Sequence, residues 1–197
     1  PWFMSKLVTP ETSASTAKPT FPALTIPSHV SMLSGIAPTR HHMLHNDHDS
    51  ILKPVAAPTI FELVNKSGKR SSAVAAKEKL KVVFGGSKID SFYVPSWPVL
   101  GDFIGRLPGL IDQAALNEIK ENRPAFLFVH YASVDTAGHW FQWGSVQQKW
   151  ALKAVDRSIE RLFKGLKETL TAGTYVVIIT ADHGGHDQDR RNHPQAS

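Results

Sequence analysis

The sequence contains no cysteine. This absence excludes disulfide bonds and thiolate metal sites, so a metal ion bound to this chain must use histidine, carboxylate or hydroxyl ligands. The apolar runs are too short to cross a membrane, and the first residues lack the pattern of a cleavable signal peptide. The chain opens at Pro1 without an initiator methionine, which indicates a fragment or a processed product.

The sequence also lacks any long run of residues with the same charge. The net charge of +5 is spread over short basic clusters, with no long basic arm and no interleaved aromatic platform. This pattern is typical of a solvated basic surface and argues against nucleic-acid binding, although it is compatible with an anionic substrate. With 197 residues, 42% hydrophobic and 20% charged, the chain is long enough for one soluble globular domain over residues 1–197.

Apolar periodicity alternates between strand and helix along the chain. Alternation of this kind predicts an α/β fold with a mainly parallel central sheet covered by helices on both faces. The expected strands are 71–76, 91–94, 125–131 and 176–180. The expected helices are 27–35, 60–66, a short solvated 77–83, 102–121 with an interruption at Pro108, and 145–171.

The stretch 176–185 carries the strongest combination of signals. Four β-branched apolar residues predict a strand that is buried on both faces, and Asp182 and His183 follow its carboxyl end. An acid and an imidazole there form a short pair of metal-type ligands, and Gly184 and Gly185 leave room for a turn and a ligand. The alternative is a strand followed by an ordinary polar turn.

The strand predicted at 125–131 is followed by a second acid and histidine. Asp135 and His139 are four residues apart, so one turn of chain brings them to the same side, and Gly138 removes bulk beside them. A helix cap and a surface histidine are the alternative explanation. If both strands belong to one parallel sheet, the two Asp/His pairs lie along one edge and can converge.

Thr25 is predicted to sit just before the N-terminus of the helix at 27–35, with Pro27 or Ser28 starting the helix. Such an end binds phosphate-like anions, and a hydroxyl there can act as a nucleophile. Alternatively, Thr25 is only a strand-end residue and Ser28 only a cap. In the polar, histidine-rich loop that follows, Asn46 could donate its amide to an anion.

Two pairs of oxygen and nitrogen ligands suit two divalent cations, of which Zn²⁺ is favoured and Mn²⁺ is the second choice. Two such ions a few ångström apart can clamp the attacking and leaving oxygens of an in-line displacement at phosphorus.

Three motifs occur in this order: Phe21-Pro-x-x-Thr-x-Pro-x-His29, Val134-Asp-x-x-Gly-His139 and Thr180-Ala-Asp-His-Gly184. In this order and spacing they resemble the alkaline phosphatase superfamily, and within it the type I phosphodiesterase / nucleotide pyrophosphatase branch. The resemblance implies an alkaline phosphatase-like catalytic domain. It also implies that Thr25 is the nucleophile that carries a covalent phosphoryl intermediate and that Asn46 contacts a phosphoryl oxygen. Thr25, Asp182 and His183 would bind one metal ion, and Asp135 and His139 the other.

The sequence departs from the family pattern at three places. The family has a metal-binding Asp on the first strand, and residues 1–24 contain none, so we expect that strand to lie upstream of Pro1. The family also has a third His after the Asp-His-Gly motif; His193 is the best match and His186 the next. Finally, the segment is short for the family, so we expect the substrate-recognition insertions of the family to be missing. We also expect the core fold to be incomplete at the N-terminus and at the C-terminus, and the site with it.

The expected function is therefore a metal-dependent hydrolase of phosphoric esters that acts on a small phosphate-ester substrate. A non-catalytic or truncated metal- or phosphate-binding relative is the alternative, and the sulfatase branch is disfavoured because the nucleophile position holds Thr25. Monoester and diester activities are not separated by the sequence, and neither is the oligomeric state. Family habit favours a periplasmic or secreted location.

Overall fold

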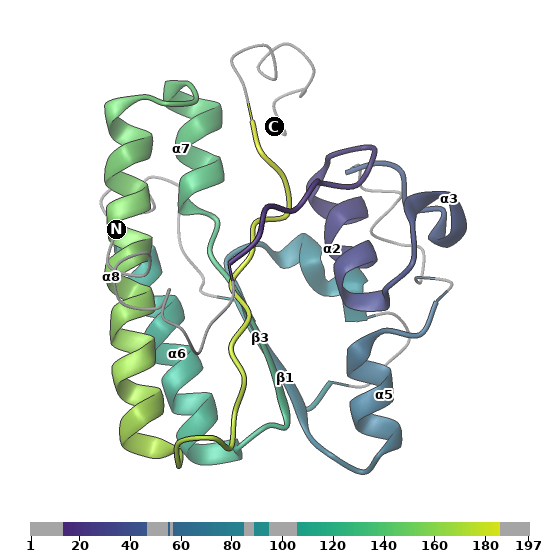
Figure 1. Ribbon diagram of the computed structural model, residues 1–197, viewed down its shortest axis with the longest axis vertical. Helices are drawn as coiled ribbons and strands as arrows, with labels where there is room; N and C mark the ends of the chain where they lie inside the picture. Colours follow the sequence, from purple (N-terminus) through teal and green to yellow (C-terminus); the bar gives the residue numbers. More distant parts are fainter. Residues whose placement is uncertain (1–13, 47–54, 56, 85–88, 95–105, 186–197) are drawn as a thin grey trace.

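The computed structural model describes residues 14–46, 55, 57–84, 89–94 and 106–185 (Figure 1). In chain order the elements are α2 (Thr25–Ser34), α3 (Pro38–His41), α5 (Ile60–Lys66), β1 (Ser71–Ala75), the 3₁₀ helix η1 (Glu78–Phe84), β2 (Ser91–Tyr93), α6 (Arg106–Asn122), β3 (Phe126–His130), α7 (Ser133–Phe141) and α8 (Val146–Thr169). Within the described residues, no helix is both long and apolar enough to span a bilayer.

The three strands form one parallel sheet in the order β2-β1-β3. β1 is central: Ala73 lies opposite Phe92 of β2 and Phe128 of β3. All five residues of β1 are buried, as expected for a central parallel strand covered on both faces. The predicted parallel α/β architecture is confirmed.

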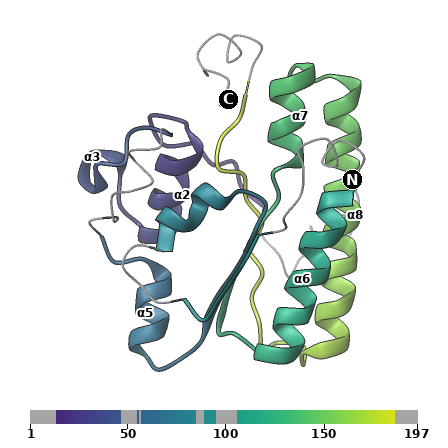
Figure 2. The same cartoon turned by 180° about the vertical axis from the view of Figure 1, so that it is seen from behind.

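Side chains alternate between the two faces of the sheet, and each face has its own core. Ala73 and Ala75 belong to a cluster with Ile26 of α2, Phe61 of α5 and Leu80 of η1. The intervening residue of β1 packs in a second cluster with apolar residues of α6: Val74, Ile111 and Ala115. Figure 1 shows α2 and α5 on one side of the strands and α6 and α8 on the other, and Figure 2 shows the same layers from behind. This period of two places helices on both faces.

Phe61 joins α5 to the sheet. Its side chain is fully buried, and its ring meets those of Phe84, Phe126 and Phe128 edge-on at centroid distances of 4.8, 5.0 and 6.5 Å. Edge-to-face contacts add to the free energy that burial of the ring contributes. This cluster therefore anchors the face of the sheet that also carries α2.

We expect Phe61→Leu to lower the free energy of unfolding by about 2 kcal/mol, because it leaves a cavity and removes the ring contacts. Urea denaturation followed by circular dichroism measures this change. Leu63→Ala is the control on the same helix, since Leu63 is 58% exposed; its effect should stay within about 0.5 kcal/mol. Equal effects of the two substitutions would show that Phe61 does not anchor the core.

The prediction of a buried strand at 176–180 is wrong. The described chain there is extended but belongs to no strand, and Val176 and Ile178 are 88% and 84% exposed. In both views this segment runs alongside β3 (Figures 1 and 2). No backbone hydrogen bond between it and β3 is recorded among the described residues. β-Branched residues favour extended backbone, but a strand requires a paired ladder, and no neighbouring strand among those described supplies one.

Two helix predictions also need correction. The segment expected as a short solvated helix at 77–83 is η1, which buries Leu80, Val82, Val83 and Phe84; the lysines hid this apolar stripe. The helix expected at 102–121 is α6, Arg106–Asn122, with Pro108 in its first turn rather than at an interruption. The expected start at residues 102–105 lies outside the described part of the chain. The predicted long helix is confirmed as α8, with Ser145 capping it through a bond from the Gln148 amide.

Candidate functional site

The predicted site residues come together at the carboxyl ends of β1 and β3. Four segments contribute: the start of α2, the loop after α3, helix α7 and the extended chain after residue 180. Figure 1 shows α2 and α7 on opposite sides of that end of the sheet, with the chain after residue 180 passing between them. In parallel sheets this edge is where ligands bind.

Thr25 is the first residue of α2, so the helix begins two or three residues earlier than the predicted start at Pro27 or Ser28. Leu24 has the extended conformation of a helix cap, and Pro27 falls in the first turn, where its missing N–H costs no hydrogen bond. Ser28 is not the cap: its hydroxyl lies 3.2 Å from that of Thr20. Gly35 ends α2 in the left-handed region at φ 74°, as predicted. Thr25 itself is 3% exposed.

Asn46 is tied to the same helix end. Its Oδ1 accepts a hydrogen bond of 2.8 Å from the backbone N–H of Ile26. Because only the amide oxygen can accept from that N–H, the orientation of the amide is determined, and its NH₂ group remains a donor. This arrangement leaves Asn46 able to donate to an anion close to Thr25.

His183 and Asp182 lie beside the hydroxyl of Thr25. The Nε2 atom of His183 is 3.4 Å from Thr25 Oγ1 and 3.3 Å from Asp182 Oδ2. The His183 side chain is 10% exposed and that of Asp182 is 21% exposed, so both are largely removed from solvent. A nucleophile-type hydroxyl and a pair of ligand-type side chains are therefore in contact across 158 residues of sequence.

The second pair is carried by α7 and reaches the first. His139 Nε2 lies 3.3 Å from Asp135 Oδ1, at the predicted spacing of one helical turn. His183 Nε2 is 3.8 Å from the same oxygen, which connects the two pairs. Asp135 Oδ1 is nevertheless buried and accepts no hydrogen bond of good geometry from any described residue. A buried carboxylate oxygen flanked by two imidazoles is a vacant acceptor at the centre of the site.

Lys77 was missed by the sequence analysis, which placed it on a solvated helix. Its Nζ donates to Asp135 Oδ2 at 2.5 Å. Burial works to raise the pKa of Asp135, but His139 and the charge of Lys77 outweigh it and hold that pKa well below its ordinary value. Asp135 is therefore ionised at any physiological pH. The sequence signal was its position two residues after a buried strand.

His29, part of the first motif, has a role that the sequence did not show. Its Nδ1 donates to the backbone carbonyl of Thr25 at 2.7 Å and lies 3.5 Å from Asp182 Oδ2. Burial lowers the pKa of His29, and the opposing charge of Asp182 only partly offsets this. The neutral ring packs edge-on against Phe128 and His130 of β3. It thereby holds the start of α2 against the sheet.

Trp143 packs beside the second pair. Its ring lies 5.6 Å from that of His139, edge-on. A Cβ on Gly138 would come within 2.8 Å of Trp143, and a Cβ on Gly185 would overlap the indole. The room at Gly185 is therefore filled by Trp143, while a Cβ on Gly184 would meet nothing within 4 Å. Because Gly138 and Gly185 lack a Cβ, the segments that carry the two motifs can both pack closely against the Trp143 ring.

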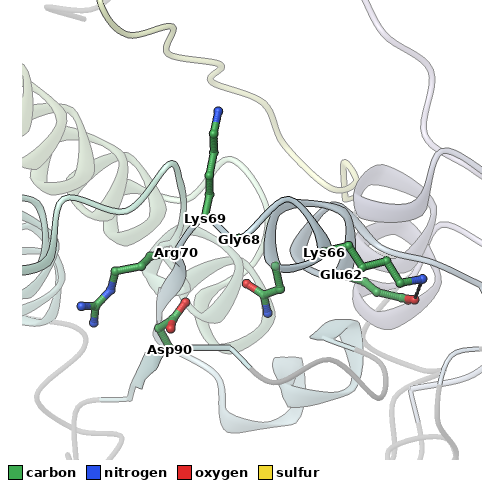
Figure 3. A pocket seen from close by; sticks show the side chains of 7 residues that line it. Glu62, Lys66, Gly68, Lys69, Arg70 and Asp90 are labelled. Atoms are coloured by element: carbon green, nitrogen blue, oxygen red, sulfur yellow. Dashed lines mark ion pairs between the residues drawn. The ribbon is translucent and has the colours of Figure 1, made fainter.

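Two surface cavities among the described residues are large enough to accept a small substrate. One of about 310 Å³ is lined by residues 17–20, 28, 31, 32 and 180–184, which include Asp182 and His183. The other, of about 530 Å³, lies at the opposite end of β1 (Figure 3). Its lining charges are partly committed, since Glu62 pairs with Lys66 and Asp90 accepts from a backbone amide. The smaller cavity is the one that adjoins the converging residues.

The expectation of a metal site rests on the carboxylate and imidazole donors of the two Asp/His pairs. Within the described ranges, no group of three or more His, Asp or Glu side chains is arranged to hold a metal ion. The orphaned Oδ1 of Asp135, with imidazole nitrogens at 3.3 and 3.8 Å, fits a cation in donor chemistry. The candidate third ligands, His193 and His186, lie outside the described residues.

Curated relatives align with nearly the whole chain. A venom phosphodiesterase from Macrovipera lebetinus is 27% identical over 193 residues, which is 92% of this chain and 22% of that protein. Ectonucleotide pyrophosphatase/phosphodiesterase family member 1 from Homo sapiens is 24% identical over 197 residues, 92% of this chain and 21% of that protein. The chain thus spans about a fifth of the length of these relatives.

Solved structures share the fold at low sequence identity. Phosphonoacetate hydrolase from Sinorhizobium meliloti 1021, in complex with phosphonoacetate, superposes with a TM-score of 0.58 and 18% identity over 75% of this chain and 44% of that one. Murine ectonucleotide pyrophosphatase / phosphodiesterase 5, an inactive form in complex with AMP, gives 0.59 and 19% over 78% and 43%.

The model of one family, type I phosphodiesterase / nucleotide pyrophosphatase, matches residues 2–195. This match covers all three motifs and every site residue discussed above. The chain therefore belongs to the type I phosphodiesterase / nucleotide pyrophosphatase family.

Proposed function

We propose that this chain carries the catalytic centre of a metal-dependent hydrolase of phosphoric esters that works through a phospho-threonine intermediate on Thr25. One observation carries the proposal: the Thr25 hydroxyl, at a helix N-terminus, contacts His183, which links both Asp/His pairs. A hydroxyl, an anion-binding helix end and two carboxylate–imidazole pairs within a few ångström are the parts that phosphoryl transfer requires.

The start of α2 positions the phosphoryl group. Backbone N–H groups in the first turn have no helical partner, and their dipoles favour an anion there. The Ile26 N–H is used by Asn46, which presents its own NH₂ to the same region. His29 fixes the Thr25 carbonyl, so the hydroxyl is held by a helix end that is anchored on both sides.

The reaction then has two displacements. Thr25 Oγ1 attacks phosphorus, the Oγ–P bond forms, and the bond from phosphorus to the leaving-group oxygen breaks; the leaving group takes up a proton. Water next attacks phosphorus on the opposite side, the Oγ–P bond breaks, and the phosphoryl product leaves while Thr25 regains its proton. Thr25 is 3% exposed, so the folded chain shields its hydroxyl from most bulk water.

Two divalent ions, Zn²⁺ or Mn²⁺, would be held by Thr25, Asp182 and His183 and by Asp135 and His139. When bound, such ions lower the pKa of the hydroxyl and of water and neutralise charge that develops on the phosphoryl oxygens. The orphaned, ionised Asp135 supports this assignment, because a buried anion next to imidazoles gains most from a cation. His193 remains the proposed further ligand.

The names of the relatives support a small phosphate-ester or phosphonate substrate. AMP and phosphonoacetate are bound in the two structural neighbours, and both are small phosphorus anions. The words "venom" and "ectonucleotide" in the names of the curated relatives favour a periplasmic or secreted location for this protein.

Metal content and turnover test the proposal together. We expect the purified chain, with no metal added, to contain about two zinc or manganese ions per molecule by elemental analysis. It should hydrolyse 4-nitrophenyl phosphate or bis(4-nitrophenyl) phosphate, and a chelator should remove this activity reversibly. Metal at that ratio without hydrolysis of either compound would instead support a non-catalytic metal-binding relative. One metal ion or none would contradict the metal-dependent hydrolase and support a truncated or phosphate-binding relative.

A further inference from the structure

Trp143 touches both of the segments that carry the Asp/His pairs. It lies in the turn that joins α7 to α8, four residues after His139 (Figure 1). Its ring meets the His139 imidazole edge-on at a centroid distance of 5.6 Å. The same ring lies so close to the Gly185 backbone that a Cβ on that glycine would overlap it. One side chain therefore bridges the last turn of α7 and the chain that follows Asp182.

The turn that carries Trp143 is fixed by hydrogen bonds. Gly144 has a φ of 80°, a conformation that suits glycine, and its N–H donates to Oε1 of Gln148 at 2.6 Å. The Gln148 amide nitrogen donates in turn to the backbone carbonyl of Val134, at 3.3 Å. Because Gln148 belongs to the first turn of α8 and Val134 to α7, these two bonds tie the turn to both helices. The indole is thus carried by a rigid piece of backbone.

The contact at Gly185 bears on the orientation of His183. The Nδ1 atom of His183 lies 2.8 Å from the carbonyl oxygen of Gly184, the residue just before Gly185. A carbonyl oxygen can only accept, so Nδ1 carries the proton, and in the neutral ring the lone pair is on Nε2. That nitrogen lies 3.4 Å from Thr25 Oγ1 and 3.8 Å from Asp135 Oδ1. The Gly184 carbonyl therefore selects the ring nitrogen that a cation would use.

The backbone at 184–185 is held by the indole. Residues 176–180 belong to no strand, so a sheet ladder does not fix the chain that leads to the site. A Cβ on Gly184 would meet nothing within 4 Å, whereas Gly185 rests on the Trp143 ring. A metal-binding histidine is commonly oriented by a backbone carbonyl that accepts its other N–H. Here the segment that supplies this carbonyl packs on Trp143.

The contact at His139 acts on the imidazole of the second pair. The His139 Nε2 atom lies 3.3 Å from Asp135 Oδ1, while its ring packs against Trp143. A Cβ on Gly138 would come within 2.8 Å of the indole, so the backbone of α7 is in close contact with it as well. An imidazole held between a carboxylate and an aromatic ring has little freedom to rotate.

We propose that Trp143 is a positioning residue of the metal site, which holds one imidazole of each Asp/His pair in the orientation that binds a cation. It acts on His139 through ring contact and on His183 through the backbone of Gly184 and Gly185. The inference rests on the proposed function and assigns to that site a residue outside the three motifs. Replacing a residue that orients a metal-binding histidine typically weakens metal binding by about 10- to 100-fold.

Zinc binding by the full chain tests this inference, with circular dichroism to show that each variant is folded. We expect Trp143→Ala to bind zinc at least about tenfold more weakly than the parent chain in titration calorimetry. Trp143→Phe keeps an aromatic ring in the turn and should recover most of the affinity. Trp150→Ala is the control: it removes the same side chain from α8, where Trp150 is 60% exposed, and should bind zinc as the parent does.

Two glycine variants repeat the test with the indole in place. Gly185→Ala puts a methyl group where the indole lies, so the ring or the backbone must move, and zinc affinity should fall as it does in Trp143→Ala. Gly184→Ala adds the same methyl group one residue earlier, in open space, and keeps the carbonyl that accepts from His183. Its loss of affinity should be much smaller. Neither glycine has a φ in the left-handed region, so neither substitution meets the conformational cost of that region.

The outcomes separate the inference from the proposed function. Parental zinc affinity in folded Trp143→Ala would overturn the inference and leave the proposed function standing. Equal losses in Gly184→Ala and Gly185→Ala would overturn it too, because contact with the indole would then not be the cause; this pair decides if Trp143→Ala fails to fold. A parent chain that binds no zinc would contradict the proposed function and the inference with it.

Discussion

Replacing Thr25 by alanine lowers kcat/KM for phosphate esters by at least about 10³-fold, because the covalent route loses its nucleophile. The metal content stays close to that of the parent chain, since the remaining ligands of both pairs are untouched. Thr25 is 3% exposed, and among the described residues its hydroxyl has one recorded side-chain partner, His183, so loss of the hydroxyl leaves only a small void. Steady-state kinetics and elemental analysis on the same preparation measure both quantities.

Two matched variants show that the loss is specific to the nucleophile. Thr25→Ser keeps a hydroxyl and should retain measurable turnover and a trapped phosphoryl group on residue 25. Thr174→Ala removes an exposed hydroxyl whose recorded bond within the described part of the chain is to Thr171 in its own turn, and the kinetics of this variant should match those of the parent. Activity that survives in Thr25→Ala would show that another group attacks phosphorus.

Replacing Asp182 by asparagine removes one metal ion per chain and lowers activity by about 10³-fold. The amide keeps the size of the side chain but loses the negative charge that a divalent cation needs, and loss of a direct ligand exceeds the effect of losing a supporting residue. Asp182 contacts His183 and His29, so its surroundings are otherwise preserved. Zinc titration followed by elemental analysis measures the stoichiometry.

Glu168→Gln is the matched control, because it removes a carboxylate from the exposed side of α8. It should leave both the metal content and the activity unchanged. If Asp182→Asn retains the parental metal content, the assignment of Asp182 as a ligand is wrong. If metal is lost while activity persists, the metal on that side has no part in the chemistry.

Much of the architecture could be predicted from local pattern. The strands at 71–75 and 126–130 and the helices at 60–66 and 146–169 lie within a residue or two of their expected bounds. In these segments the period of the apolar residues and the turn chemistry agree, and such agreement specifies local structure. The parallel sheet could be predicted as well, because strands that alternate with helices along a chain pair in parallel.

The stretch 176–180 shows a structural feature that the local sequence pattern does not predict. Its four β-branched residues favour extended backbone, and the chain is extended there, but pairing depends on a neighbour that the local sequence does not contain. η1 shows the opposite error: the lysines at 77, 79 and 81 suggested a solvated face, while Leu80 is fully buried. A side chain's surroundings are set by the elements that pack on it.

The sequence by itself determined which chemical groups are present and in which order: a hydroxyl at a helix end, two Asp/His pairs after apolar runs, and no thiol. Only the tertiary structure decided that these groups meet, that His183 touches both Thr25 and Asp182, and that Asp135 faces Lys77. The physical reason is distance along the chain. Local propensity acts over a few residues, whereas Thr25 and His183 are brought together across 158 residues by packing on both faces of one sheet.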